Sequence, residues 1–222
     1  MTKKASKEKV IRAAIELFNV QGFSGTSVRD IAHEAECNVA LISYYFGNKQ
    51  GLLEYLITDF LEGYVAVLEV QVDAALNGEE KAYDCLLQSI WNILMYQQRT
   101  HHLARFVHRE ITLDTTLVRE LMSTYLAKEK HLFDTLLKKG YSNGEVYDLP
   151  NEYFVLQLKG MLTMPFLHPQ YIREVYHLMP HENHFLDKYF SELAYWVATY
   201  FIEKNRTVNY SPAQGEAEKK DS

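Results

Sequence analysis

The sequence predicts an all-α protein. Of its 222 residues only ten are glycine and five are proline, and three of the prolines lie between Pro165 and Pro180. No alternation of apolar and polar residues recurs at regular spacing, which argues against strands. Apolar residues recur instead every three or four positions from Val10 to Phe201. With 47% apolar residues, the chain can bury the core of one or two domains.

The first two helices are expected before residue 36. Apolar residues from Val10 to Phe18 repeat with helical spacing, and Gly22 then provides a stop. Thr26 and Ser27 can cap the next helix, because their hydroxyls accept hydrogen bonds from its free N–H groups. This second helix should run for about nine residues. The face that it is expected to bury consists of Val28, Ile31, Ala32 and Ala35.

A short third helix and a long fourth helix follow. Asn38 is a good N-cap for the third helix, and Gly47 ends it. The residues expected to face inward on it are Val39 or Ile42, Tyr45 in part, and Phe46. From Lys49 the helical spacing continues for about seven turns, so the fourth helix leaves the small bundle as a connector. We therefore expect one domain over residues 1–51 and a second, helical domain over residues 52–205.

The second domain should contain several further helices. Residues 77–80 break the pattern, and a fifth helix is expected over residues 82–94. A shorter helix follows at 101–110 and a longer one at 117–137. The basic pair and glycine of Lys138–Gly140 should close the longer helix, because cations suit the carbonyl end of the helix dipole and glycine suits the C-cap.

Two later segments carry more apolar surface than one core face can hide. Between Phe154 and Met164 only three residues are polar, and an aromatic stripe runs from Phe185 to Phe201. Such a surface is best buried partly in the chain's own core and partly against a second copy, so we expect a homodimer. A wholly intramolecular core is the alternative. The side chains expected at the dimer interface are Phe154, Leu158, Met161, Phe185, Tyr189, Leu193, Trp196 and Tyr200.

Other features exclude several classes of protein. The longest uncharged stretch, 160–172, is too short for a membrane helix and contains prolines. The charged segment 3–9 lacks the apolar centre of a secretion signal, so we expect a cytoplasmic, nucleoid-associated protein. Cys37 and Cys85 form no CxxC pair and should remain thiols. Residues 206–222 lack apolar periodicity and should form a disordered tail.

Charge is distributed unevenly along the chain. Residues 1–51 hold seven Lys or Arg and five Asp or Glu, a net charge of +2. The whole chain carries −6, which leaves −8 for the remaining residues. This asymmetry suggests a polyanionic partner for the first quarter of the chain alone, because attraction to phosphate falls off within about 8–10 Å at moderate salt. Ordinary variation in charge is the alternative.

The second and third helices, with the short turn between them, form a helix-turn-helix. In this motif a short second helix can lie in a groove about 12 Å wide, but the spacing alone is weakly specific. The residues in and around the motif make the assignment more specific. The segments that occur in register are Ile15–Phe18, Gly22–Phe23, Thr26–Ala32, Ser43–Phe46 and Lys49. Their order resembles the N-terminal domain of TetR-family regulators over roughly residues 8–60, which implies a DNA-binding transcriptional regulator such as a repressor.

The resemblance and the chemistry of the side chains together give the expected DNA contacts. Thr26 and Ser27 could hold a phosphate at the start of the second helix or act as plain caps. Arg29 could reach phosphate or a groove edge, or pair with a neighbouring carboxylate. In the family a lysine at the position of Lys49 lies against the sugar-phosphate backbone. The expected DNA-binding residues are Thr26, Ser27, Arg29, Asn38, Val39, Ala40, Leu41, Ser43, Tyr44, Tyr45 and Lys49.

The third helix should supply the base readers. Asn38 can pair with adenine, Ser43 can donate or accept a hydrogen bond, and small apolar side chains can contact thymine methyl groups. Tyr44 and Tyr45 suit phosphates, although Tyr45 could equally be core. The chain departs from the usual family pattern in two places. The usual turn glycine is Glu36, and Val39 occupies a position that is often basic, which implies more reliance on methyl contacts, DNA shape and symmetry.

The remaining expectations concern partners. A homodimer should read a palindromic operator, because two recognition helices about 34 Å apart meet half-sites one helical turn apart. The family's second domain usually encloses a small molecule, and aromatic or Met side chains here could line such a cavity or simply fill a core. The candidates are Trp91, Met95, Tyr96, Phe106, Tyr125, Met161 and Met164. The alternative is a DNA-bound interaction protein that regulates cell division through this domain. The histidines match no metalloenzyme motif, so we expect no cofactor, no metal and no enzymatic activity.

Overall fold

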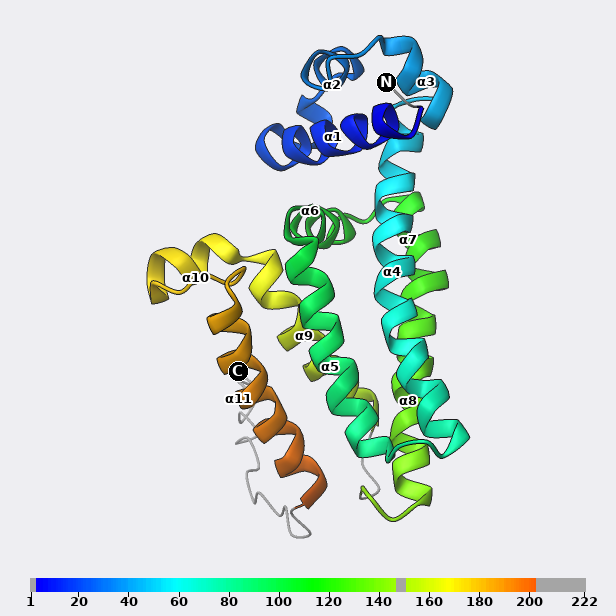
Figure 1. Ribbon diagram of the computed structural model, residues 1–222, viewed down its shortest axis with the longest axis vertical. Coiled ribbons are helices and arrows are strands. Elements are labelled where there is room, and N and C mark those ends of the chain that lie inside the picture. The colour runs from blue at the N-terminus through cyan, green and yellow to red at the C-terminus, as the bar shows by residue number, and fades with distance from the viewer. Residues whose placement is uncertain (1–2, 147–150, 203–222) are drawn as a thin grey trace, which may run out of the picture.

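The computed structural model describes residues 3–146 and 151–202, and within these residues every regular element is helical. Helix α1 and the short helices α2 and α3 gather around the start of the long helix α4, and the remaining helices pack along the rest of the molecule (Figure 1). The predicted all-α fold is therefore confirmed. In chain order the elements are α1 (Lys3–Gly25), α2 (Val28–Glu34), α3 (Val39–Phe46), α4 (Lys49–Asn77), α5 (Ala82–Arg99), α6 (His101–Ile111), α7 (Thr116–Leu121), the π-helical segment η1 (Met122–Leu126), α8 (Ala127–Ser142), α9 (Asn151–Leu167), α10 (Pro169–Tyr176) and α11 (Asn183–Ile202).

The first three helices end where their glycines and caps predict. Gly22 has φ 75° and ψ 163°, so regular α1 stops there before a last short turn. Ser27 and Asn38 cap α2 and α3 through their side chains, as expected. Gly47 takes φ 75° at the end of α3, a conformation that costs glycine little.

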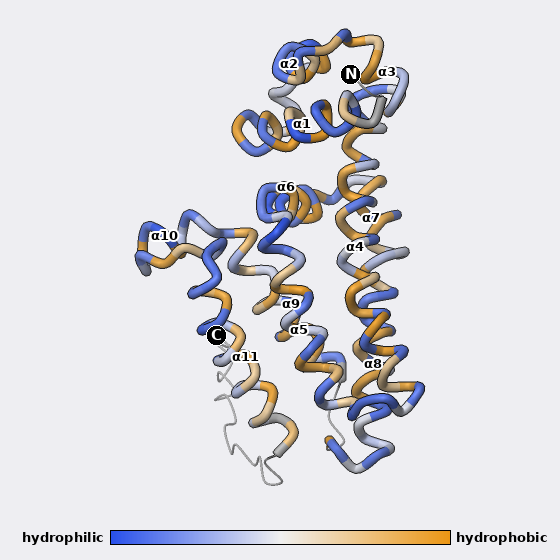
Figure 2. The backbone as a smooth tube through the Cα atoms, in the orientation of Figure 1, coloured by the Kyte–Doolittle hydropathy of each residue, from blue (hydrophilic) through white to orange (hydrophobic). Residues whose placement is uncertain are grey.

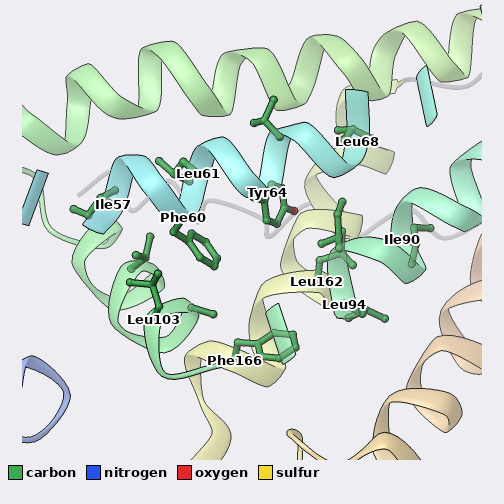
Figure 3. Close-up of a cluster of buried hydrophobic side chains, with 14 of the residues drawn as sticks. Ile57, Phe60, Leu61, Tyr64, Leu68, Ile90, Leu94, Leu103, Leu162 and Phe166 are labelled. Carbon is green, nitrogen blue, oxygen red and sulfur yellow. The ribbon is translucent and has the colours of Figure 1, made fainter. Parts of the chain in front are cut away.

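Helix α4 belongs to both halves of the molecule. Near its start Leu52 and Leu56 are fully buried, and one face stays buried as far as Ala75. Figure 3 shows side chains of this face meeting residues of α5, α6 and α9, while Figure 2 shows its hydrophobic stretches alternating with polar ones. Burying each large aliphatic side chain contributes about 1.5–3 kcal/mol, so the shared face holds the two halves in one core.

The expected helix over residues 117–137 is interrupted. One π-helical turn, Met122–Leu126, joins α7 to α8, and α8 continues to Ser142. The prediction that Gly140 closes the helix is therefore wrong. Gly140 is buried inside α8, where an added Cβ would lie 3.2 Å from both methyl groups of Val146, so close packing and not a C-cap explains this glycine.

Four of the eight side chains expected at the dimer interface are buried within the chain. Phe154, Leu158, Phe185 and Leu193 are buried in the chain's own core, so they cannot themselves be the surface that meets a second copy. Trp196 stacks on Phe154 with ring centroids 5.0 Å apart. Met161 and Tyr189 are half-buried, and the Tyr189 hydroxyl donates to the Met161 carbonyl over 2.7 Å. The side chain of Tyr200 lies outside the described residues, as does the tail 206–222.

Exposed apolar side chains do occur on the same helices, at other positions. Tyr153, Leu156 and Tyr195 are each about 70% exposed on α9 and α11. Helix α10, which the sequence did not predict, adds a second exposed group, and its members are Tyr171, Val175, Tyr176 and the following Leu178. None of the described helices has the length and hydropathy that crossing a membrane requires.

A buried polar chain links three helices of the second domain. The Gln97 amide donates to the Leu162 carbonyl over 3.0 Å, so its oxygen is left to accept from His108 Nε2 at 2.5 Å. Burial is the main cause that lowers the pKa of His108 to about 3, with the nearby Lys159 ammonium adding to it. His108 is therefore neutral in the folded protein at pH 7.

We expect the folded protein to lose stability in acid through His108. His108 takes up a proton near pH 6.5 in the unfolded chain but only near pH 3 in the folded chain. The free energy of unfolding therefore falls as pH drops through that window. Between pH 6.5 and 5 the loss should reach about 2 kcal/mol. Urea denaturation at the two pH values measures it, and His108→Gln should show a shallower pH dependence. An equal dependence in both proteins would contradict this assignment.

Candidate nucleic-acid interface

Helix α3 turns one face into the protein and the other into solvent. Ile42 is fully buried and Phe46 is 9% exposed, whereas Tyr44 is 69% and Val39 is 39% exposed. Of the two alternatives for the inward position, Ile42 is therefore the core residue. The predicted reader positions Asn38, Ala40 and Ser43 are also exposed, and Leu41 is half-buried.

Aromatic contacts fix the end of α3 against α4. The rings of Tyr44, Tyr45, Phe46 and Tyr55 follow one another edge to face, with neighbouring centroids 5.1–6.1 Å apart. Tyr45 is half-buried within this series, so it has a packing role in addition to any contact made by its hydroxyl. Tyr44 is left as the aromatic side chain that projects furthest from the helix.

The start of α2 is a capping box. The Asp30 N–H donates to the Ser27 hydroxyl over 3.1 Å, and the Ser27 N–H donates to the Asp30 carboxylate over 2.8 Å. Hydrogen bonds to the carboxylate from the Ser27 side chain, the larger cause, and from the Ser27 N–H lower the pKa of Asp30 below its usual value. The carboxylate of Asp30 already lies at the positive end of the helix, which reduces the attraction of this end for a phosphate.

Thr26 does not expose its hydroxyl as predicted. Its side chain is 1% exposed and donates to the Gly22 carbonyl over 2.9 Å. In this arrangement the hydroxyl faces the protein interior, which does not support the expected side-chain contact with phosphate. A threonine pattern alone cannot separate an exposed cap from a buried hydroxyl, whereas the chain reversal after Gly22 selects the buried arrangement.

Lys49 is also committed inside the protein. Its ammonium donates to the carbonyls of Phe23 and Thr26, both over 2.9 Å, and lies 4.4 Å from the centre of the Phe23 ring. The half-buried side chain thus ties the start of α4 to the end of α1 and the turn before α2. A lysine has three donors, so at most one remains for a phosphate.

Arg29 is a solvent-exposed cation of the helix-turn-helix. It is exposed on α2, and in the described part of the chain no carboxylate lies within ion-pair distance of it. The alternative pairing with Asp30 or Glu34 is therefore not observed. A free guanidinium one turn into α2 can make a charge-assisted bond to a phosphate.

Two lysines of α1 complete this surface. From the sequence, only their contribution to the net charge was predicted. The Lys7 ammonium lies 4.1 Å from the centre of the Tyr55 ring, beside the end of α3. Lys9 bonds Glu36 over 3.0 Å, which lowers the pKa of that carboxyl. Glu36 takes φ 51°, a left-handed turn that normally favours glycine, and the bond to Lys9 explains how a side chain is held there.

This arrangement defines a helix-turn-helix with exposed hydroxyls, one free guanidinium and a basic flank. The sequence profile of the bacterial regulatory proteins of the tetR family matches residues 10–56. The chain is also 48% identical over 200 residues to YttP of Bacillus subtilis, a probable HTH-type transcriptional regulator, and the match covers 90% of this chain and 95% of that protein. The protein belongs to the TetR family and is a DNA-binding transcriptional regulator.

Solved structures agree on the fold. PfmR, a TetR-family regulator from Thermus thermophilus, superposes with a TM-score of 0.70 at 16% identity, over 88% of this chain and 99% of its own. FadR from Bacillus subtilis, solved in complex with stearoyl-CoA, gives a TM-score of 0.64 at 19% identity, over 85% and 97% of the two chains. At these identities the likeness extends to the fold alone.

Replacing Lys49 tests its place in the structure. Lys49→Met keeps the apolar stem but removes two charge-assisted hydrogen bonds, so the free energy of unfolding should fall by about 1–3 kcal/mol. Chemical denaturation measures the change, and Lys138→Met, at an exposed lysine of α8, is the matched control. If both variants unfolded alike, Lys49 would not be the internal tie described above.

Proposed function

We propose that the protein binds a palindromic operator as a homodimer, with α3 of each copy in the major groove. The observation that carries this proposal is the two-sided α3, where Ile42 and Phe46 are buried while Ser43 and Tyr44 face solvent. A helix held in this way can enter a groove without unfolding anything. Family membership supports both DNA binding and pairing.

The contacts divide into positioning and reading. We assign Arg29, Ser27 and Tyr44 to phosphates, which fix register without reading sequence. Ala40, Val39 and Ser43 are placed for base edges and thymine methyl groups. The oxygen of Asn38 accepts the Ala40 N–H over 2.8 Å, which uses one of its two lone pairs and leaves the amide N–H groups as the main contacts for a base. With few charged readers, DNA shape and the symmetry of two half-sites should supply much of the specificity.

We place the contact between copies on the exposed faces of α9 and α11. Tyr153, Leu156 and Tyr195 are apolar or aromatic, are mostly exposed, and lie on the helices whose other faces form the core. Covering them with a second copy removes apolar surface from water. Two recognition helices spaced by about 34 Å would then meet successive major grooves on one face of the DNA.

A small-molecule effector is a further part of the family pattern. The FadR structure contains stearoyl-CoA, and a ligand of this chain would act by favouring one spacing of the two recognition helices over another. The side chains predicted to line one cavity do not gather in that way. Phe106 is buried and stacks on Phe18, while Trp91 packs on Phe190 beside a surface hollow of about 540 Å³.

The second candidate function is a DNA-bound interaction protein that regulates cell division. Residues 25–29 and 38–46 resemble RefZ, the division-ring regulator of sporulating bacilli. The exposed apolar group on α10 supports this candidate, because such a surface can dock a protein. Ligand-dependent release of DNA would count against it, and capture of one specific protein through α10 would favour it.

Selection of bound fragments from genomic DNA tests the operator. We expect a palindromic consensus, and Tyr44→Ala should weaken binding to every selected fragment by about 1–2 kcal/mol through loss of a charge-assisted phosphate bond. Arg29→Gln should lower the slope of log affinity against log salt by about one. Tyr141→Ala, at an exposed tyrosine on α8, is the matched control. Binding that ignored both interface changes would refute the site.

The dimer is tested by charge at its centre. Leu156→Glu places a carboxylate in the proposed interface, where it would be desolvated without a partner, so the variant should be a monomer at micromolar concentration. Sedimentation velocity measures the mass. Val70→Glu, at an exposed valine of α4, should remain paired. A monomeric wild type would refute the proposed homodimer, and a dimer that Leu156→Glu leaves intact would place the interface elsewhere.

A further inference from the structure

A cleft of about 560 Å³ separates the DNA-binding helices from the second domain. One wall is the end of α1 and the first turns of α4, including Phe23, Leu53 and Ile57. The opposite wall is the end of α6 and the start of α7, including Leu113 and Leu117. Figure 1 shows α6 beneath α1 and α7 alongside α4. The volume of this cleft is within the range of small-molecule sites.

One ionisable residue, Glu110, is among those that line the cleft. Its side chain is 9% exposed, yet no hydrogen bond to it is seen in the described part of the chain. The nearest cation is the Nε of Arg109, 3.7 Å away. A carboxylate can only accept hydrogen bonds, so further bonds to Glu110 must come from water or from a ligand in the cleft.

Arg109 cannot easily turn to satisfy it. Its Nη2 donates to the Phe18 carbonyl over 2.6 Å, and its Nη1 to the Asn19 carbonyl over 3.5 Å. These bonds commit the guanidinium to the backbone of α1. Burial raises the pKa of Glu110, and the Arg109 charge opposes this only in part. Apart from this 3.7 Å ion pair, no cation is seen at the carboxylate in the described residues, and the other residues that line the cleft are apolar or neutral.

We propose that this interdomain cleft binds a small organic cation, with an ammonium or amidinium group on Glu110 and an apolar body against Leu53, Ile57 and Leu117. A metal ion fits poorly, because one carboxylate supplies too few ligands, and the described residues contain no cluster of three metal-ligating side chains. An anion would meet the Glu110 charge. The apolar walls and the single acidic group together select an amphiphilic amine.

Such a ligand would touch both domains. It would contact the end of α1 and the start of α4, which position α2 and α3, and also α6 and α7. A difference in its affinity between two placements of the domains would change DNA affinity by up to the same factor. This coupling rests on the proposed function, whereas ligand binding itself does not.

Matched probes test the site in the wild-type protein. Hexylammonium and benzylammonium, their alcohols hexanol and benzyl alcohol, and the anions hexanoate and benzoate are titrated by calorimetry at pH 7. The amines should bind at least tenfold more tightly than the alcohols, and the anions should not bind. Methyl NMR should show contacts from the bound amine to Leu113, Leu117 and Val118. Amines that bind no better than alcohols, or that contact other methyl groups, would overturn the proposal.

Two variants isolate the charge. Glu110→Gln keeps the shape of the side chain and should lose the preference for amines at least tenfold, with alcohol binding unchanged. Asp114→Asn removes an exposed carboxylate from the loop beside the cleft and should bind amines as the wild type does. An equal loss in both would mean a general charge effect and would refute the site. If Glu110→Gln does not fold, the comparison of amines with alcohols decides alone.

DNA affinity is measured last, with and without benzylammonium. The coupling predicts a change in operator affinity that Glu110→Gln abolishes. An unchanged affinity with proven amine binding would remove the coupling and leave the site. Absence of operator binding by the protein without any probe would instead contradict the proposed function.

Discussion

The buried face of α4 is the constraint on which both halves of the molecule depend. Leu52 and Leu56 belong to the core beneath α1 and α3, while Phe60, Tyr64 and Leu68 belong to the core of the second domain. Because one helix supplies both sets, a shift of the second domain along α4 would also move the helix-turn-helix. The fold thereby couples the positions of the two halves.

Hydrogen bonds from polar side chains hold the end of α1 against α4 and α6. Lys49 fastens the start of α4 to the carbonyls of Phe23 and Thr26, and Arg109 fastens α6 to the carbonyls at the end of α1. Asn19 adds a bond from its amide to the His102 carbonyl over 2.8 Å. Cations thus bind the carbonyl end of α1 from two directions, where the helix dipole favours positive charge. The interdomain cleft lies beside these hydrogen bonds, so a ligand bound there would act on the contacts that join the two domains.

Local patterns predicted the helices and the recognition surface better than they predicted the fate of single side chains. The caps at Ser27, Asn38 and Gly47 follow from local chemistry and were predicted, as was the exposure of Tyr44 and Ser43. The hydrogen bonds of Thr26 and Lys49 were not predicted, because their partners are backbone carbonyls brought near by the kink at Gly22. The π turn in front of α8 and the burial of Gly140 likewise arise from packing between distant segments.

The aromatic stripe of α11 shows the same limit. Periodicity identified its apolar residues, but it could not tell which of them are buried within the chain and which are exposed. Phe185 and Leu193 are buried, whereas Tyr195, a position outside the predicted set, is exposed. Glu110 was missed altogether, because an acidic residue on an amphipathic helix carries no sign of burial until α1 and α7 are placed around it.

Hydroxyl-radical footprinting on one selected DNA fragment tests the central claim most directly, since it maps the backbone contacts of every bound copy. The account predicts two protected patches on one face of the duplex, about one helical turn apart and related by a two-fold axis, both lost together in Tyr44→Ala. A single protected patch, or protection that follows the minor groove with no symmetry, would contradict it.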